Sequence, residues 1–110
     1  MNWIATQSLH DVEAIIERSR QVPCLILKHS TTCPISSLAK YRLEKQWDLP
    51  EGTVEPYYLD LLRHRDVSNY IASAFEVRHE SPQILLIKDG VCVHQASHLD
   101  IRVDEVRQTA

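Results

Sequence analysis

Glycine is scarce in this chain, which contains only Gly52 and Gly90 among its 110 residues. Loops that cradle phosphate groups, such as G-x-G-x-x-G and the P-loop, place several glycines close together so that the backbone can approach the phosphates. Two glycines this far apart cannot form such a loop. The sequence therefore excludes nucleotide-binding sites of these types.

An excess of basic residues is also missing. Lys and Arg number 12 against 15 Asp and Glu, the net charge is −3, and the two signs are interspersed. This balance provides no positive field for a nucleic-acid backbone. No apolar run approaches the ~20 residues of a membrane-spanning helix, and the first residues lack the pattern of a signal peptide. We expect no nucleic-acid partner, no membrane association and a cytoplasmic location.

The three cysteines are too few for a disulfide framework and lack the C-x-x-C spacing of many zinc sites. Their odd number is typical of a reducing compartment, and we expect no bound metal. Cys24 lies within an apolar run and is expected to pack in the core. Cys92 alternates with valines and is also expected to be structural, although a resolving or regulatory role stays open.

The residues that are present alternate between strand and helix patterns. Strands are predicted near residues 3–4 and at 24–28, 54–61, 83–88 and 91–95. Helices are predicted at 8–20, 34–47 and 66–75, followed by a short one that is capped by Asp100 and contains Ile101 and Val106. Asp89-Gly90 is the expected hairpin turn. The pattern predicts one α/β domain over residues 1–110, with a mixed sheet covered by helices on both faces.

The segment Thr32-Cys33-Pro34-Ile35-Ser36 places a cysteine at the start of a helix. Proline suits the first helical position, because its missing N–H would have no intrahelical partner there. The free amides and the dipole of a helix N-terminus favour negative charge, so this turn is expected to stabilise a Cys33 thiolate. Ser36 is expected to satisfy backbone amides and to donate to the thiolate. Cys33 is therefore the predicted nucleophile.

Three further side chains are candidates around this thiol, and the rest of the helix predicts a buried stripe. His29 is four residues before Cys33 and is a candidate for tuning the thiolate, although a solvent-facing position is favoured. Lys28 and Arg78 are candidate contacts for an anionic thiol ligand, with solvated surface charge as the alternative. The predicted apolar stripe of the helix consists of Ile35, Leu38, Ala39, Leu43 and Trp47.

The order of strand, Cys-Pro-x-Ser, helix and then Ser81-Pro82 before a hairpin resembles the thioredoxin superfamily. This resemblance implies a thioredoxin-like fold in which the Ser81-Pro82 bond is cis and Pro82 faces Cys33 across a substrate groove. Together with Ser81-Pro82-Gln83 and the run from His98 to Ile101, the motif at 32–36 is similar to that of the monothiol bacilliredoxins.

The narrower resemblance implies a reaction. Bacilliredoxins remove bacillithiol from S-bacillithiolated proteins, which would make bacillithiol a thiol co-substrate of this chain, with no tightly bound cofactor. Ser36 stands where dithiol relatives carry a resolving cysteine, so an external thiol is expected to recycle Cys33.

Other functions stay open at this stage. One is glutaredoxin-like exchange with another low-molecular-weight thiol. A second is a [2Fe–2S] cluster shared between two Cys33 residues, which Pro34 disfavours because the cluster-binding relatives carry glycine after the cysteine. The third is a non-catalytic thioredoxin-fold module that holds a partner in the groove beside Pro82.

Overall fold

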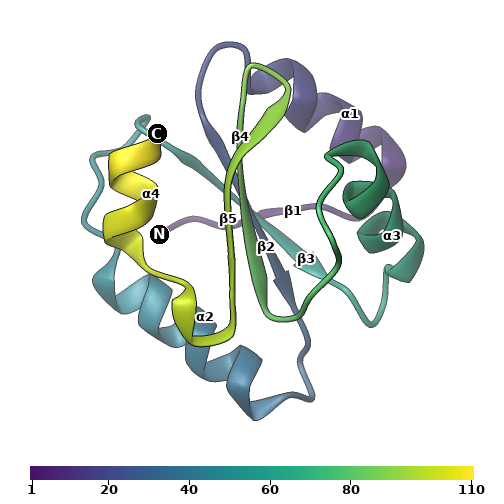
Figure 1. The fold of residues 1–110 in the computed structure, drawn as a ribbon, viewed down its shortest axis with the longest axis vertical. Helices are drawn as coiled ribbons and strands as arrows, with labels where there is room; N and C mark the ends of the chain where they lie inside the picture. Colours follow the sequence, from purple (N-terminus) through teal and green to yellow (C-terminus); the bar gives the residue numbers. More distant parts are fainter.

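The structure is a computed structural model that describes residues 1–110. Its elements in chain order are β1 (Ile4–Ala5), α1 (Leu9–Arg18), β2 (Cys24–His29), α2 (Pro34–Gln46), β3 (Glu55–Asp60), α3 (Arg65–Ala74), β4 (Gln83–Lys88), β5 (Val91–Ser97), the 3-10 helix η1 (His98–Asp100) and α4 (Val103–Thr109). Figure 1 shows the strands in the middle of the molecule, with α1 and α3 on one side and α2 and α4 on the other. None of the helices has the length and apolar character needed to span a membrane.

The five strands form one mixed sheet in the order β1-β3-β2-β4-β5. Strands β1, β3 and β2 are parallel, whereas β4 runs antiparallel to both β2 and β5. Lys28 at the end of β2 therefore lies opposite Gln83 at the start of β4. The loop that carries Cys33 and the segment that carries Pro82 consequently leave the sheet at the same end.

Apolar side chains on the two faces of the sheet build two separate cores. Every residue of β2 is buried, and side chains along a strand alternate between faces. Leu25 and Leu27 pack with residues of α2 and α4, while Cys24 and Ile26 pack with residues of α1 and α3. The prediction of an α/β domain with helices on both faces of a mixed sheet is confirmed.

The Asp89-Gly90 turn joins β4 and β5 as predicted. Both residues have positive φ, 53° for Asp89 and 79° for Gly90, which is the backbone of a hairpin turn that follows the sheet's twist. The first helix is also capped as predicted, because Ser8 Oγ accepts the amide hydrogen of Asp11 at 3.1 Å.

Two predictions about helices are wrong in detail. The last helix begins at Val103, with Arg102 as its N-cap, because Asp100 belongs to η1 and Ile101 is extended and buried. In α2, the buried residues are Ser36, Ala39 and Leu43, whereas Ile35 is 50% exposed and Leu38 is 48% exposed. A buried serine replaces the predicted apolar contacts at the start of α2.

Candidate active site

Cys33 is the N-cap residue of α2, between the end of β2 and Pro34 at the first helical position. Its backbone is extended, its amide donates to the carbonyl of Ser30 at 3.2 Å, and its carbonyl accepts from Ser37 at 3.0 Å. The residue is half-buried, and its side chain makes no capping hydrogen bond. The thiol therefore lies beside the free amides of the helix start without a protein partner.

Ser36 lies beneath this turn and is completely buried. Its Oγ accepts the amide hydrogen of Ser30 at 3.0 Å and lies 2.6 Å from Nδ1 of His29. These bonds join the end of β2, the loop and the first turn of α2. The expectation that Ser36 satisfies backbone amides is met at Ser30, but its hydroxyl bonds His29 rather than the Cys33 thiol. Ser36 thus fixes the loop in which Cys33 stands.

His29 is buried, with 6% of its surface exposed, so the expectation of a solvent-facing histidine is wrong. Burial is the main cause that lowers its pKa, and the positive charge of Lys40 lowers it further. A neutral ring leaves Nδ1 free to accept the hydroxyl hydrogen of Ser36, whose oxygen already accepts from Ser30. Through its bond to Ser36, His29 therefore stabilises the turn that carries Cys33.

Pro82 lies at the same end of the sheet as Cys33, as the register of β2 and β4 requires. The Ser81-Pro82 peptide bond is cis, as the thioredoxin resemblance implies. Pro82 is buried, and its carbonyl accepts the amide hydrogen of His98 at 3.0 Å. The Oγ of Ser81 is buried and has no hydrogen-bond partner in the protein. The segment before β4 therefore offers an unused hydroxyl next to Pro82.

The other two predicted contacts lie in different surroundings. Lys28 is 0% exposed, because its side chain points into the α1/α3 side of the sheet, and it cannot act as a surface contact for a ligand. Arg78 is exposed and lines a polar cavity together with Glu80 and Asp100. Only Arg78 keeps the accessibility that a ligand contact needs.

Sequence patterns did not identify Lys40, a cation on the helix that follows Cys33, as a candidate. Lys40 lies in α2, lines a cavity of about 230 Å³ with His29 and Ser37, and forms an ion pair with Glu44 at 2.7 Å. Its ammonium is also 5.7 Å from the ring centroid of Tyr58. Spacing along α2 placed Lys40 on the helix, but only the fold shows that it lines a cavity with His29.

Several apolar side chains are exposed along the helix that follows Cys33. Ile35, Leu38 and Tyr41 are exposed along α2, and Leu99 is exposed in η1, which packs against α2. We call these four residues the apolar rim. Exposed apolar side chains that are neighbours on a surface are typical of protein-binding sites. Leu99 was missed from the sequence, because its place beside α2 depends on the chain returning through β5.

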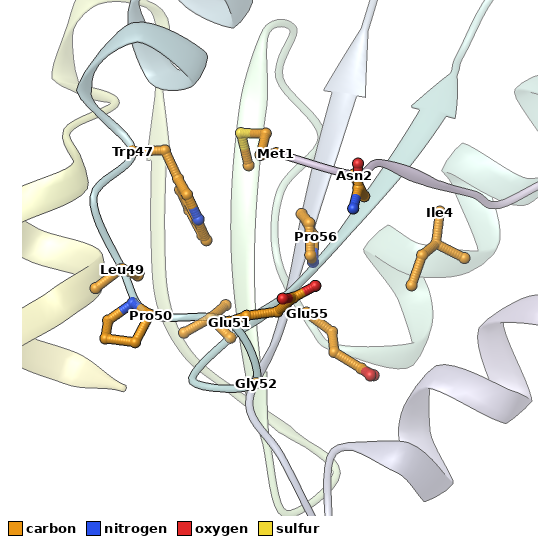
Figure 2. A pocket seen from close by; sticks show the side chains of 11 residues that line it. Met1, Asn2, Ile4, Trp47, Leu49, Pro50, Glu51, Gly52, Glu55 and Pro56 are labelled. Atoms are coloured by element: carbon orange, nitrogen blue, oxygen red, sulfur yellow. The ribbon is translucent and has the colours of Figure 1, made fainter.

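The largest cavity of the protein lies away from Cys33. Figure 2 shows its lining, to which the first residues of the chain and the segment between α2 and β3 contribute. Its volume is about 550 Å³. It reaches Glu55 and Pro56 at the start of β3, whereas Cys33 follows the end of the parallel strand β2. This cavity is therefore separate from the thiol site.

The remaining two thiols lie at the far end of the sheet. Cys24 pairs in register with Ile87, and Ile87 with Cys92, whereas Gln83 marks the end near Cys33. Four residues of β4 span roughly 13 Å, while a disulfide requires Cα atoms within about 7 Å. All three cysteines are free. Neither Cys24 nor Cys92 can therefore resolve a Cys33 disulfide within one molecule.

The environments of these two thiols are those of packed side chains. Burial raises the pKa of Cys24 to about 11, and burial also raises that of Cys92. The Cys92 thiol donates to the carbonyl of His94 at 3.2 Å.

The structure shows no metal-binding cluster. His94 and His98 are four residues apart, but His94 lies in a strand rather than on a helix. No group of three or more His, Cys, Asp or Glu side chains is arranged to hold a metal.

Comparison with known proteins shows the family to which this chain belongs. Residues 4–106 match the sequence profile of the family described as monothiol bacilliredoxin BrxC. The chain belongs to the monothiol bacilliredoxin family. Family and fold together assign it a thiol–disulfide redox role.

Solved structures agree with this assignment. A protein described as a candidate oxidoreductase with a thioredoxin fold is 38% identical, with a TM-score of 0.82 over 96% of this chain and 91% of that one. The thioredoxin of Malassezia sympodialis is 15% identical, with a TM-score of 0.77 over 98% and 90% of the two chains. Fasciola hepatica thioredoxin is 19% identical, with a TM-score of 0.70 over 96% and 93%. The two thioredoxins support the fold alone.

Proposed function

We propose that this bacilliredoxin removes bacillithiol from protein mixed disulfides through Cys33. The Cys33 thiolate attacks the bacillithiol sulfur, a new disulfide forms between Cys33 and bacillithiol, and the protein thiolate leaves and takes a proton from solvent. An external thiol then attacks the bacillithiol sulfur of this adduct. The Cys33 thiolate is released, and the external thiol becomes a mixed disulfide with bacillithiol. External thiols supply both electrons for the reduction.

The observation that carries this proposal is the isolation of Cys33. It lies half-buried at the start of a helix, Ser36 occupies the position of a resolving cysteine, and the other two thiols are at the far end of the sheet. A thiol placed in this way can form a mixed disulfide but cannot close an internal one. The monothiol route requires this arrangement.

The surface beside the thiol supports two kinds of substrate contact. The apolar rim provides a surface for the protein half of the mixed disulfide. Lys40 is the cation that we expect to meet the anionic part of the small thiol. It is seven residues from Cys33, about 10 Å along the helix at 1.5 Å per residue. We place Lys40 in the role first considered for Lys28, because Lys28 is enclosed.

Mass spectrometry with a bacillithiol-capped protein tests this function directly. Mixing should transfer bacillithiol to Cys33 and release the free protein thiol. Cys33→Ser should abolish the transfer, whereas Cys92→Ser, the matched control, should retain it. A bacillithiol adduct on Cys92, or full transfer by Cys33→Ser, would contradict the mechanism.

The same assay with a glutathione-capped version of the same protein distinguishes the small thiols. Faster removal of bacillithiol supports the proposal. Equal or faster removal of glutathione would assign the chain to glutaredoxin-like exchange. Binding of the capped protein without any transfer would favour the non-catalytic module.

A further inference from the structure

Lys28 is the largest of the fully buried side chains, and it makes no ion pair. It is on the face of β2 that packs against α1 and α3, two residues after Ile26. Its Nζ has one side-chain partner, Nδ1 of His79, at 3.2 Å. A buried ammonium without a carboxylate destabilises a fold relative to an apolar side chain of similar size. Stability alone therefore does not explain why a lysine occupies this buried position.

His79 connects this buried amine to the segment that carries Pro82. It lies in the stretch 76–82 between α3 and β4, and the residue is exposed, although the contacts of its Nδ1 are partly buried. Its Nδ1 also lies 3.3 Å from Oγ of Ser68, which is buried in α3. One imidazole nitrogen thus ties the segment 76–82 to both β2 and α3.

The hydrogens available to these groups make the contact sensitive to protons. A neutral imidazole with its hydrogen on Nε2 accepts at Nδ1 from the Lys28 ammonium. Protonation of His79 places an N–H on Nδ1, which then faces the ammonium as a second donor and a second positive charge. The hydrogen bond therefore forms while Lys28 is protonated and His79 is neutral. It breaks when both side chains are protonated.

The other groups around Lys28 and His79 do not remove this dependence of the contact on protonation. Burial lowers the pKa of Lys28 to about 8. Burial is the largest cause that lowers the pKa of His79. The charges of Lys28 and Arg65 lower this pKa further, and the charge of Glu80 raises it. The register partners of Lys28 on β3 and β4, Leu59 and Gln83, are uncharged.

Gln83 links the end of the segment 76–82 to the backbone around His79. It is 0% exposed, its Nε2 donates to the carbonyl of Arg78 at 3.0 Å, and its Oε1 accepts from the amide of Glu80 at 3.4 Å. These bonds flank His79 on both sides. Movement of His79 would therefore be transmitted to the backbone that leads into Pro82.

We propose that Lys28 and His79 form a proton-sensitive clamp that positions the segment 76–82, and with it Ser81 and Pro82, at the end of the sheet where Cys33 lies. Both are positioning residues, since neither touches the reacting sulfur atoms. The effect on disulfide exchange rests on the proposed function, whereas the clamp itself does not. The clamp is closed near neutral pH and opens when His79 is protonated.

NMR of the full chain tests the clamp without any activity measurement. The amide of Val77, which donates to Ala72 at 3.0 Å, and the amide of Glu80 report on the segment. In the wild type, their protection from hydrogen exchange should fall roughly ten- to a hundredfold as His79 is titrated with acid, the range for one hydrogen bond to a charged group.

Two variants and a control separate the clamp from a merely structural role. His79→Gln keeps an acceptor but cannot titrate, so protection should persist without the pH step. Lys28→Met should show at every pH the low protection that the wild type shows only in acid, and it should move the titration of the His79 ring upward, because a positive neighbour is lost. Lys88→Met removes an exposed lysine from β4 and should behave as the wild type.

Equal His79 titrations in Lys28→Met and the wild type would overturn the proposal, as would a pH step that survives in His79→Gln. The exchange reaction provides a second readout. Lys28→Met should slow transfer from a protein mixed disulfide but leave the alkylation rate of Cys33 by iodoacetamide unchanged, since alkylation does not use Pro82. Absence of all transfer by the wild type, with the pH step intact, would refute the proposed function and leave the clamp standing.

Discussion

The buried hydroxyl of Ser36 should contribute strongly to stability, although serine is usually a surface residue. Ser36→Ala removes the bonds of Oγ to Nδ1 of His29 at 2.6 Å and to the amide of Ser30 at 3.0 Å. Both groups belong to buried residues, so each is left without a partner. An unsatisfied buried group costs about 1–3 kcal/mol, and we expect Ser36→Ala to lower the free energy of unfolding by about 2–4 kcal/mol.

Ser37 provides a matched control, because it is the next residue of α2 and is exposed. Ser37→Ala should change the free energy of unfolding by less than about 0.5 kcal/mol, as is usual for surface positions. Urea unfolding followed by tryptophan fluorescence measures both variants. At roughly 4 °C per kcal/mol, Ser36→Ala should also lower the melting temperature by roughly 10 °C. Equal stabilities of the two variants would refute the assignment of Ser36 as a fixed support of the Cys33 turn.

Three further predictions follow from the same geometry. Ser36→Cys should form an internal disulfide with Cys33 on oxidation, visible as the loss of two hydrogens in the intact mass; a reduced mass after oxidation would contradict it. Lys28→Met should raise the free energy of unfolding by about 1–3 kcal/mol at neutral pH, because an unpaired buried charge is removed. Leu38→Ser in the apolar rim should slow transfer from a protein mixed disulfide several-fold but leave reduction of a small disulfide unchanged; equal slowing of both would argue against a protein-binding rim.

The free energy of unfolding of the wild type should also depend on pH through the titration of Lys28. The native state releases this proton near pH 8, earlier than the unfolded chain, whose lysines titrate near 10.5. The unfolded state therefore binds more protons in this interval, and the free energy of unfolding should rise with pH between the two values. Lys28→Met should lack this rise when unfolding is measured across the same pH range, and a rise that persists in the variant would assign it to another group.

Local patterns predicted most of the fold. The continuous apolar run of β2, the spacing of apolar residues in α1 and α3 and the Asp89-Gly90 turn each report on their own few residues, and all appear where expected. The last helix starts later than predicted, because Asp100 is used in η1 and not as a cap. Boundaries of this kind depend on neighbours that are distant in sequence.

The sequence by itself determined the family and predicted the reactive residue: a cysteine before a proline-led helix, with serine at the resolving position and Pro82 added by the family pattern. Only the tertiary structure decided which polar side chains are buried. Strand alternation and helical spacing treat Lys28, His29 and Ser36 as polar surface, and the sheet encloses all three. The physical reason is that each of these three groups is held by a partner outside its own helix or strand, and hydrogen bonds such as Lys28 to His79 join residues that local sequence patterns cannot pair.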